Sequence, residues 1–268
     1  MTAESTSLLM AVEIAEGDLA LLVFERRRKG PKKYLVRIEM GKVFHTHLGP
    51  VDLGELIGRR WGCSVEVKKG VARVFRPTTA DIMEKLSRKT QIIYPKDAAY
   101  MIIKSGVRPG DLVVEGGTGS GSLAYALSLS VGPTGKVVSY EVNPKFHEMA
   151  KENLRRLGVR NVELKLGDLR TDITERDVDA MFLDMAAPWE VLPAAREVLK
   201  PGAPLAVFVP SCEQIKKFAV AARDGGFGHI EVAEVLVRGY EVNEQRTRPA
   251  ARMIAHTGFV VTARKLVD

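Results

Sequence analysis

The chain has 268 residues, a formal net charge of +7, 46% hydrophobic residues and 27% charged residues. This composition excludes a disordered chain, a collagen-like repeat and a coiled coil, and the length allows one large domain or a medium and a small one. Two cysteines, Cys63 and Cys212, are too few for a secreted disulfide framework and lack the paired spacing of a zinc site. With no apolar run near the roughly 18 residues of a membrane helix and no signal-peptide pattern, we expect a cytoplasmic protein without membrane association or metal.

The positive charge is concentrated in the first third of the chain. Residues 1–90 carry a net charge of +6, whereas residues 91–268 carry only +1. Lysine and arginine side chains that neutralise phosphates release counterions, so a basic module beside a nearly neutral one is typical of a polyanion-binding appendage. A charge-rich, solvated surface explains the same count, and composition alone does not separate the two interpretations.

The N-terminal part of the chain has the pattern of a small β-rich domain. Short apolar segments alternate with turn-forming glycines and a Gly30-Pro31 pair. We therefore predict a basic, β-barrel-like domain over residues 1–76, followed by a linker helix over residues 77–90 with a threonine or aspartate cap. The predicted strands of this domain cover residues 19–25, 34–39, 43–47, 64–68 and 71–75.

Residues 91–268 alternate between strand-like and helix-like segments. Strands separated by helices of this length build a parallel, doubly wound sheet, so we predict an α/β domain with a Rossmann-like sheet. Two β-rich segments between residues 230 and 264, joined by a polar and basic stretch, predict an antiparallel pair at the end of this sheet. The predicted helices cover residues 96–105, 122–131 and 144–157, and the predicted strands cover residues 111–115, 136–141, 162–165, 180–184 and 203–209.

A glycine-rich loop connects a predicted strand to a predicted helix. Gly117, Gly119 and Gly121 form a Gly-x-Gly-x-Gly pattern with the acid Glu115 just before it. Such a loop at the carboxyl edge of a parallel sheet binds nucleotide-like ligands, because glycines let the ligand approach the backbone. Ser122 stands where a P-loop needs lysine and where a dinucleotide fingerprint needs its last glycine. The remaining match is the pattern of class I methyltransferases, which bind S-adenosylmethionine.

Two further acids follow the next predicted strands. Glu141 lies twenty residues after Gly121, where a carboxylate can accept hydrogen bonds from both ribose hydroxyls; the alternative is a surface acid at a strand end. Asp168 follows Gly167 after the third strand and can accept a hydrogen bond from the adenine amino group, or serve only as a turn residue.

Two longer motifs carry a resemblance to a family. The segment TQIIYPKD at residues 90–97 and the segment FLDMAAPWE at residues 182–190, together with the glycine loop, resemble the tRNA adenine-N1 methyltransferases that act on the T-loop. The resemblance spans nearly the whole chain, and the archaeal and bacterial homotetrameric form is the more similar one. It implies methyl transfer from S-adenosylmethionine to N1 of adenine 58 of tRNA, and in archaeal members also of adenine 57. It assigns cofactor binding to Gln91, Ile93, Glu115, Gly117, Gly119, Ser120, Gly121, Ser122, Glu141, Asp168, Leu169 and Asp184.

The resemblance also implies that Asp184 is the catalytic residue. An acid at the end of an apolar strand is costly unless it has a partner or a task. Methylation at N1 acidifies the exocyclic amine of adenine, so a carboxylate that accepts from this amine orients the base and acts as the proton acceptor. The target base must be flipped out of its loop, and Tyr94 and Pro210 are the predicted walls of its pocket. A structural cap for Asp184, and simple packing for Tyr94 and Pro210, are the alternatives.

Three other functions are weighed against this one. A methyltransferase for a protein or a small molecule would use the same sheet, because fold does not determine substrate. A non-catalytic tRNA-binding subunit would be expected to lose the glycine loop and the acid at position 184, and both are intact. An NAD-dependent oxidoreductase is disfavoured by Ser122.

Overall fold

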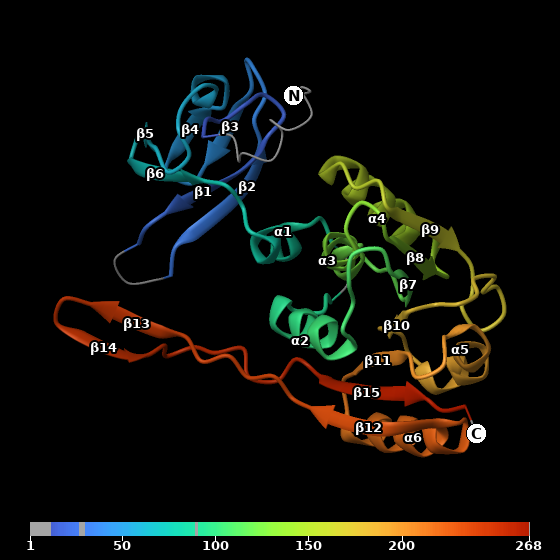
Figure 1. Cartoon of the computed structure of the whole chain (residues 1–268). Coiled ribbons are helices and arrows are strands. Elements are labelled where there is room, and N and C mark those ends of the chain that lie inside the picture. Colours follow the sequence, from blue (N-terminus) through green and yellow to red (C-terminus); the bar gives the residue numbers. More distant parts are fainter. Residues whose placement is uncertain (1–11, 27–29, 89–90, 268) are drawn as a thin grey trace, which may run out of the picture. The chain divides into compact units, whose positions relative to one another are not determined.

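The computed structural model describes residues 12–26, 30–88 and 91–267. The chain divides into two compact units, the first ending at Lys85 and the second beginning at Leu86 (Figure 1). Within the described ranges, no helix combines the length and the apolar character needed to cross a membrane.

The first unit is built from antiparallel strands. Four strands form a sheet in the order β2-β1-β6-β5, and two more form a separate ribbon, β3-β4. The described pairings do not close into a ring, so the unit is an antiparallel sheet domain. The sequence predicts five of these strands and misses β4, because its Gly49 and Pro50 are typical of turns. The elements are β1 (Leu19–Phe24), β2 (Lys32–Arg37), β3 (Val43–Thr46), β4 (Gly49–Asp52), the 3₁₀ helix η2 (Gly54–Leu56), β5 (Ser64–Val67), β6 (Gly70–Phe75) and α1 (Thr79–Lys85).

Helix α1 is fixed to strand β2 of the same unit by one buried acid. Asp81 accepts hydrogen bonds from the Thr78 hydroxyl at 2.7 Å and from Lys33 Nζ at 2.8 Å. The Thr78 hydroxyl lies in turn 3.2 Å from the backbone N–H of Asp81, which is the reciprocal arrangement of a helix N-terminus. These contacts determine where the last residue of α1, Lys85, lies relative to β2.

The second unit is a seven-stranded sheet in the order β12-β15-β11-β10-β7-β8-β9. The five strands from β11 to β9 run parallel, whereas β15 is antiparallel to β11 and β12. The predicted Rossmann-like sheet with a final antiparallel pair is confirmed. The elements are α2 (Pro95–Ser105), β7 (Leu112–Gly116), α3 (Ser122–Val131), β8 (Lys136–Glu141), α4 (Pro144–Leu157), β9 (Val162–Leu166), β10 (Ala180–Leu183), η3 (Pro188–Val191), α5 (Leu192–Val198), β11 (Pro204–Val209), α6 (Cys212–Asp224), β12 (Phe227–Ala233) and β15 (Phe259–Lys265).

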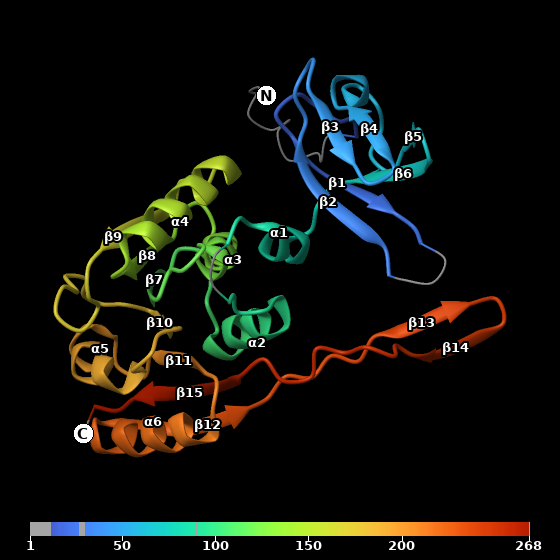
Figure 2. The ribbon, with the colours of Figure 1, turned by 180° about the vertical axis from the view of Figure 1, so that it is seen from behind.

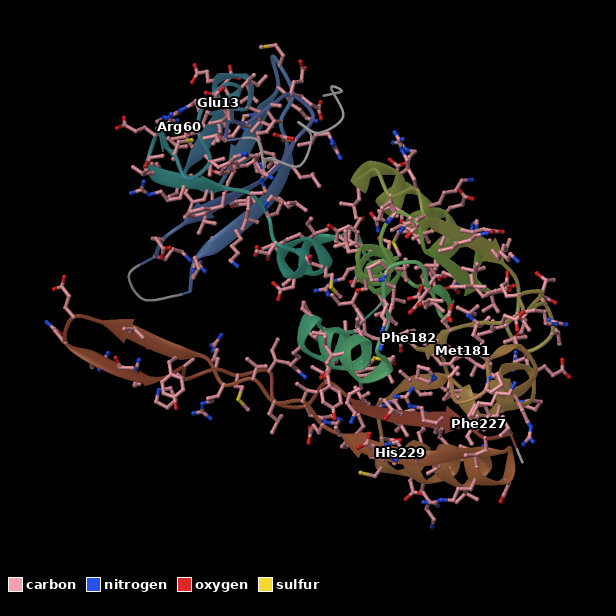
Figure 3. The ribbon with its side chains drawn as sticks, viewed as in Figure 1. Glu13, Arg60, Met181, Phe182, Phe227 and His229 are labelled. Atoms are coloured by element: carbon pink, nitrogen blue, oxygen red, sulfur yellow. The ribbon has the colours of Figure 1, made fainter. Side chains whose placement is uncertain are left out.

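Strand β10 lies in the middle of this sheet and is buried on both faces. Met181 and Phe182, labelled in Figure 3, point to opposite faces and are both fully buried. This burial explains why the strand has no alternation of polar and apolar residues, as expected for a parallel sheet covered on both sides. The residue that follows the strand is Asp184, which is thereby placed at the carboxyl edge of the sheet.

A hairpin arm, here defined as residues 234–258, connects β12 to β15. It contains the paired strands β13 (Tyr240–Asn243) and β14 (Arg246–Pro249) and extends away from the seven-stranded sheet (Figures 1 and 2). The sequence predicts only a polar and basic connection here. The hairpin was missed because its strands are exposed and therefore lack the apolar face on which strand prediction depends.

Candidate active site

A cavity of about 350 Å³ lies at the carboxyl ends of β7, β8 and β10. This edge is where open parallel sheets bind their ligands. The cavity is lined by Gln91, Gly116, Gly117, Gly119, Tyr140, Glu141, Val142, Phe146, Gly167, Leu169, Asp184, Met185 and Ala186.

The glycine loop lies unusually close to the end of strand β10. Gly117 has a φ of +91°, and a Cβ atom at this position would lie 2.0 Å from the carbonyl oxygen of Asp184. Only glycine is compatible with both the conformation and the contact. The backbone N–H of Gly117 donates to the carbonyl of Tyr140 at 3.0 Å, which ties the loop to strand β8. The loop therefore provides a backbone-lined wall that a ligand can approach closely.

Glu141 is held at the cavity by two backbone hydrogen bonds. Its Oε2 accepts from the N–H of Gly119 at 2.9 Å, and its Oε1 accepts from the N–H of Asn143 at 2.9 Å. An ionised carboxylate has about four acceptor sites, so each oxygen keeps capacity for another donor. These two hydrogen bonds fix the orientation of the Glu141 side chain at the cavity, and its contact with a ribose stays a prediction.

Three carboxyl groups, Glu115, Glu141 and Asp184, lie close together at this edge of the sheet. Burial, reinforced by the charge of Glu141, raises the pKa of Asp184 to about 6. Burial also raises the pKa of Glu115 to about 8, with Asp184 and Glu141 adding to the shift and a hydrogen bond from Ser139 opposing it. Across the described residues, no group of three histidine, cysteine or acidic side chains is arranged to hold a metal ion.

Glu115 lies behind the glycine loop and does not line the cavity. It is fully buried, and its Oε2 accepts from the Ser139 hydroxyl at 2.6 Å. The Ser139 oxygen is also 2.6 Å from the Thr118 hydroxyl. Ser139 therefore bridges Glu115 on strand β7 and Thr118 in the glycine loop. This chain of hydrogen bonds fastens the loop to strands β7 and β8.

Six of the predicted cofactor residues line the cavity, and the others lie around it. Ile93, Ser120 and Ser122 are buried, and Gly121 packs against helix α4, where a Cβ would lie 3.3 Å from Leu154 Cγ. The predicted residues that line the cavity are Gln91, Gly117, Gly119, Glu141, Leu169 and Asp184.

The carboxylate of Asp168 is engaged by an arginine. Arg170 Nε lies 2.9 Å from both oxygens of Asp168, and its Nη1 lies 2.6 Å from Glu190. Gly167 and Leu169, on either side of Asp168, line the cavity, whereas Asp168 itself does not. The pairing lowers the pKa of Asp168, with the hydrogen bond from Arg170 as the main cause.

Tyr94 and Pro210, the predicted walls for the target base, do not line the cavity. Tyr94 is half-buried directly before helix α2, and Pro210 is exposed directly after strand β11. The carbonyl of Pro210 lies 3.3 Å from His256 Nε2 on the hairpin arm. Both residues lie in the second unit, one at the start of a helix and one at the carboxyl edge of the sheet.

Sequence reasoning missed about half of the cavity. The sequence signal for Gly116 is its place directly before Gly117 in the glycine-rich loop, and the structure shows that a Cβ there would lie 2.6 Å from Leu169 Cδ2. Most of the others are direct neighbours of predicted residues, whereas Phe146 on helix α4 has no sequence signal. The missed residues are Gly116, Tyr140, Val142, Phe146, Gly167, Met185 and Ala186.

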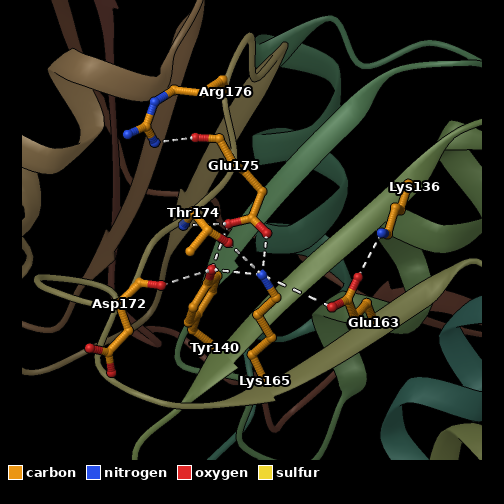
Figure 4. Close-up of polar contacts among 8 residues, drawn as sticks. All are labelled: Lys136, Tyr140, Glu163, Lys165, Asp172, Thr174, Glu175 and Arg176. Atoms are coloured by element: carbon orange, nitrogen blue, oxygen red, sulfur yellow. Dashed lines mark hydrogen bonds and ion pairs between the residues drawn. The ribbon is translucent and has the colours of Figure 1, made fainter.

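A polar network supports the cavity wall at Tyr140 (Figure 4). The Tyr140 hydroxyl donates to Glu175 Oε2 at 2.5 Å, and Lys165 Nζ donates to Glu175 Oε1 at 2.5 Å. Lys165 Nζ also lies 3.2 Å from the Tyr140 oxygen and 2.9 Å from Thr174 Oγ1. The network joins β8 and β9 to the segment that leads to β10, so it fixes Tyr140 from the side opposite to the glycine loop.

Comparison with known proteins agrees with this geometry. Residues 70–262 match the family described as tRNA methyltransferase complex GCD14 subunit. The chain is 35% identical to the tRNA (adenine(57)-N(1)/adenine(58)-N(1))-methyltransferase TrmI of Methanocaldococcus jannaschii, over 91% of this chain and 94% of that protein.

Two solved structures are similar over almost the whole chain. One is an S-adenosylmethionine-dependent O-methyltransferase of Thermotoga maritima, with 34% identity, a TM-score of 0.89 and 96% of both chains covered. The other is the tRNA (m1A58) methyltransferase TrmI of Aquifex aeolicus, with 31% identity, a TM-score of 0.83, and 96% of this chain and all of that chain covered. With the glycine loop, the cavity and the family match in agreement, the chain belongs to the family of the tRNA methyltransferase complex GCD14 subunit.

Proposed function

We propose that this chain transfers a methyl group from S-adenosylmethionine to N1 of adenine 58 in the T-loop of tRNA, with adenine 57 as a second position to be examined. The observation that carries the proposal is the placement of Asp184. Its carboxyl group, with a raised pKa, lines the same cavity as the glycine loop and Glu141. Membership of a tRNA methyltransferase family supports the choice of substrate.

The residues of the cavity fit S-adenosylmethionine. This cofactor, when bound, supplies a methyl group on a positively charged sulfur. Glu141 is oriented to accept the ribose hydroxyls, and the backbone at Gly117 and Gly119 would face the methionine part. Leu169 offers an apolar contact to the adenine ring, and the carboxyl groups of Glu141 and Asp184, which line the cavity, favour the positive charge. Gln91 closes the cavity from the segment before helix α2.

Asp184 is assigned two tasks toward the target adenine. No hydrogen bond to its carboxylate is found among the described residues, so both oxygens are available to an exocyclic amine. A carboxylate in this place orients N1 toward the methyl donor and stabilises the positive charge that develops on the ring. It then accepts the proton that the amine loses, and its pKa near 6 suits a group that must be ionised at neutral pH and still bind a proton.

A second candidate function is methyl transfer to the oxygen of a small molecule or a protein. The similarity to a structure named as an O-methyltransferase favours it. The same cavity and the same acid would serve a hydroxyl acceptor, because the fold does not select the substrate. The net charge of +6 in residues 1–90 favours the tRNA substrate, since a small neutral acceptor needs no basic module.

We also infer a homotetramer and a cytoplasmic location for this chain. The resemblance to the homotetrameric archaeal and bacterial enzymes supports the first inference. The free thiols of Cys63 and Cys212 support the second, because cytoplasmic proteins keep their cysteines reduced. Sedimentation equilibrium of the purified chain measures the assembly, and a monomer would contradict the inferred tetramer.

The decisive experiment measures methyl transfer from labelled S-adenosylmethionine to unmodified tRNA transcripts, with the product mapped by mass spectrometry. We expect 1-methyladenosine at position 58, loss of product with Asp184→Ala and Asp184→Asn, and weaker but measurable cofactor binding by calorimetry in both variants. Transcripts with adenine 57 or adenine 58 replaced test which position is modified. If the cofactor binds but no tRNA is methylated, the small-molecule or protein function takes its place; without cofactor binding, the methyltransferase assignment itself is wrong.

A further inference from the structure

The first unit contains a second cavity, of about 400 Å³, in which basic residues predominate. We propose that this cavity is a binding site for backbone phosphates of the tRNA substrate, an inference that rests on the proposed function. All of its residues lie within the first unit, after strand β1, along β2 and at the end of α1. They are Arg26, Pro31, Lys32, Lys33, Tyr34, Leu35 and Lys85.

The cavity carries more positive charge than its surroundings neutralise. Four of its seven lining residues are lysine or arginine, and none is acidic. In the part of the chain that the structure describes, Asp81 is the acid that pairs with one of these cations, through Lys33 Nζ at 2.8 Å. A net charge of about +3 therefore remains at the cavity. A polyanion is the ligand class that this surplus favours.

The cations are held in place from three different elements. The Arg26 guanidinium donates to the carbonyl of Gly30 through Nε at 2.9 Å and through Nη2 at 2.7 Å. Lys32 Nζ lies 5.3 Å from the centre of the Tyr34 ring, within the range of a cation–π contact. Lys85 ends helix α1, which Asp81 ties to strand β2. Arg26, Lys32 and Lys33 thus each contact a partner within the unit, and the backbone of Lys85 is placed by its helix.

A neighbouring histidine responds to the same positive potential. His47 Nδ1 lies 3.1 Å from the Tyr34 hydroxyl, next to the cavity. Its pKa is lowered, first by desolvation and then by the charges of Lys32 and Arg26. The charges of Lys32 and Arg26 therefore reach His47, beside the cavity.

Phosphate of an RNA backbone fits this site better than the carboxylates of an acidic protein. Arginine and lysine around one concave surface match the phosphates of a folded RNA, where non-specific backbone contacts position the substrate and carry no sequence information. An enzyme that modifies one base of a large, folded RNA needs such positioning contacts away from the reacting base.

The test compares tRNA binding by the full chain and two variants across salt concentrations. Lys32→Gln/Lys85→Gln removes two cations of the cavity, and Lys69→Gln removes an exposed lysine of the same unit outside it. Each phosphate contact contributes about 0.9 to the slope of log K against log salt, or about 3.5-fold in affinity between 50 and 200 mM salt. Between 50 and 200 mM salt, a variant that lacks two contacts should therefore lose about 12-fold less affinity for tRNA than the wild type loses.

We expect the double variant to bind unmodified tRNA more weakly at 50 mM salt and with a slope lower by about two. We expect Lys69→Gln and the charge-preserving Lys32→Arg/Lys85→Arg to keep the wild-type slope. A double variant with the wild-type slope and affinity overturns the proposed phosphate site, even when the enzyme methylates adenine 58. A wild-type chain that binds cofactor but neither binds nor methylates tRNA instead refutes the proposed function, so the two failures are distinguishable.

Discussion

Neutralising one partner of the buried ion pair between Lys96 and Asp97 is expected to destabilise the second unit. Asp97 is completely buried in the first turn of helix α2, and the Lys96 side chain is only 12% exposed. Lys96 Nζ lies 2.9 and 3.0 Å from the two Asp97 oxygens, 2.6 Å from the Val235 carbonyl and 2.7 Å from Thr257 Oγ1. The Thr257 hydroxyl also donates to Asp97 at 2.7 Å. The cluster thereby joins the start of α2 to both ends of the hairpin arm.

The perturbation is Asp97→Asn, which keeps the shape of the side chain and removes its charge. Breaking a buried ion pair by neutralising one partner costs about 3–5 kcal/mol, because the remaining charge stays buried. Lys96 keeps two oxygen partners, Val235 and Thr257, so the lower end of this range, about 3 kcal/mol, is expected. For a unit of this size, 1 kcal/mol corresponds to about 2–4 °C, and the melting temperature should fall by about 6–12 °C.

The assay is differential scanning calorimetry of the full chain, following the transition of the larger unit. The matched control is Glu152→Gln, which breaks an exposed cluster with Arg155 and Arg156. Exposed ion pairs contribute little, so the control should melt close to the wild type. If Asp97→Asn shifts the transition no more than Glu152→Gln does, burial does not strengthen this pair and the reasoning is wrong.

Three further outcomes test the active site. Gly117→Ala should weaken S-adenosylmethionine binding by more than about tenfold in calorimetry. The new Cβ would lie 2.0 Å from the carbonyl oxygen of Asp184, so the loop must move at a cost of at least about 1.4 kcal/mol. An affinity equal to that of the wild type would show that the loop adapts without affecting the site. With S-adenosylmethionine well below its KM, so that the free enzyme is reported, kcat/KM for tRNA should level off above about pH 7 and fall about tenfold between pH 6.5 and pH 5, because Asp184 must be ionised. A flat profile contradicts its role as a base. The pKa of Glu115 is raised from its ordinary 4.5 to about 8, so the folded state holds this proton more tightly and stability falls as the pH rises from about 4.5 to about 8. In Glu115→Gln, the free energy of unfolding measured in urea should not show this part of the decline with pH. A decline as large as that of the wild type would refute the raised pKa of Glu115.

Much of the second unit could be predicted because its local patterns agree with its tertiary structure. The helices at Ser122–Val131 and Pro144–Leu157 and the strand at Lys136–Glu141 occur where the sequence predicts them. Helix α4 shows why: the Asn143 side chain accepts from the N–H of Lys145 at its start, and Gly158 adopts a left-handed conformation at its end. Both signals are local, so they are readable without knowledge of the fold.

For the candidate site, the sequence predicts which residues lie at the ends of the strands but not where their side chains point. The sequence places Glu115, Glu141 and Asp184 at the carboxyl edge of one sheet, because parallel strands share that edge. The direction of each side chain depends on pleat and register instead: Glu115 is paired with Ser139 across the sheet and points behind the loop, away from the cavity. The sequence also does not determine whether Asp168 pairs with Arg170. Two residues of opposite charge this close in the chain can either pair with each other or both face a ligand.

The electrostatics of the cavity link the binding of a cation to the readiness of the base. Asp184 is protonated more readily than an ordinary aspartate because of its burial and the charge of Glu141. A positive charge brought into the cavity opposes both effects, since it lowers the pKa of nearby carboxyl groups. By linkage, a ligand that lowers the pKa of Asp184 binds more tightly to the ionised form, so the cation and the ionised carboxylate favour each other. The pKa seen in kcat, which reports the loaded enzyme, should therefore lie below the pKa near 6 of the free cavity. A neutral thioether product lacks this charge, so the same acids that favour the methyl donor also favour exchange of the product for a new donor.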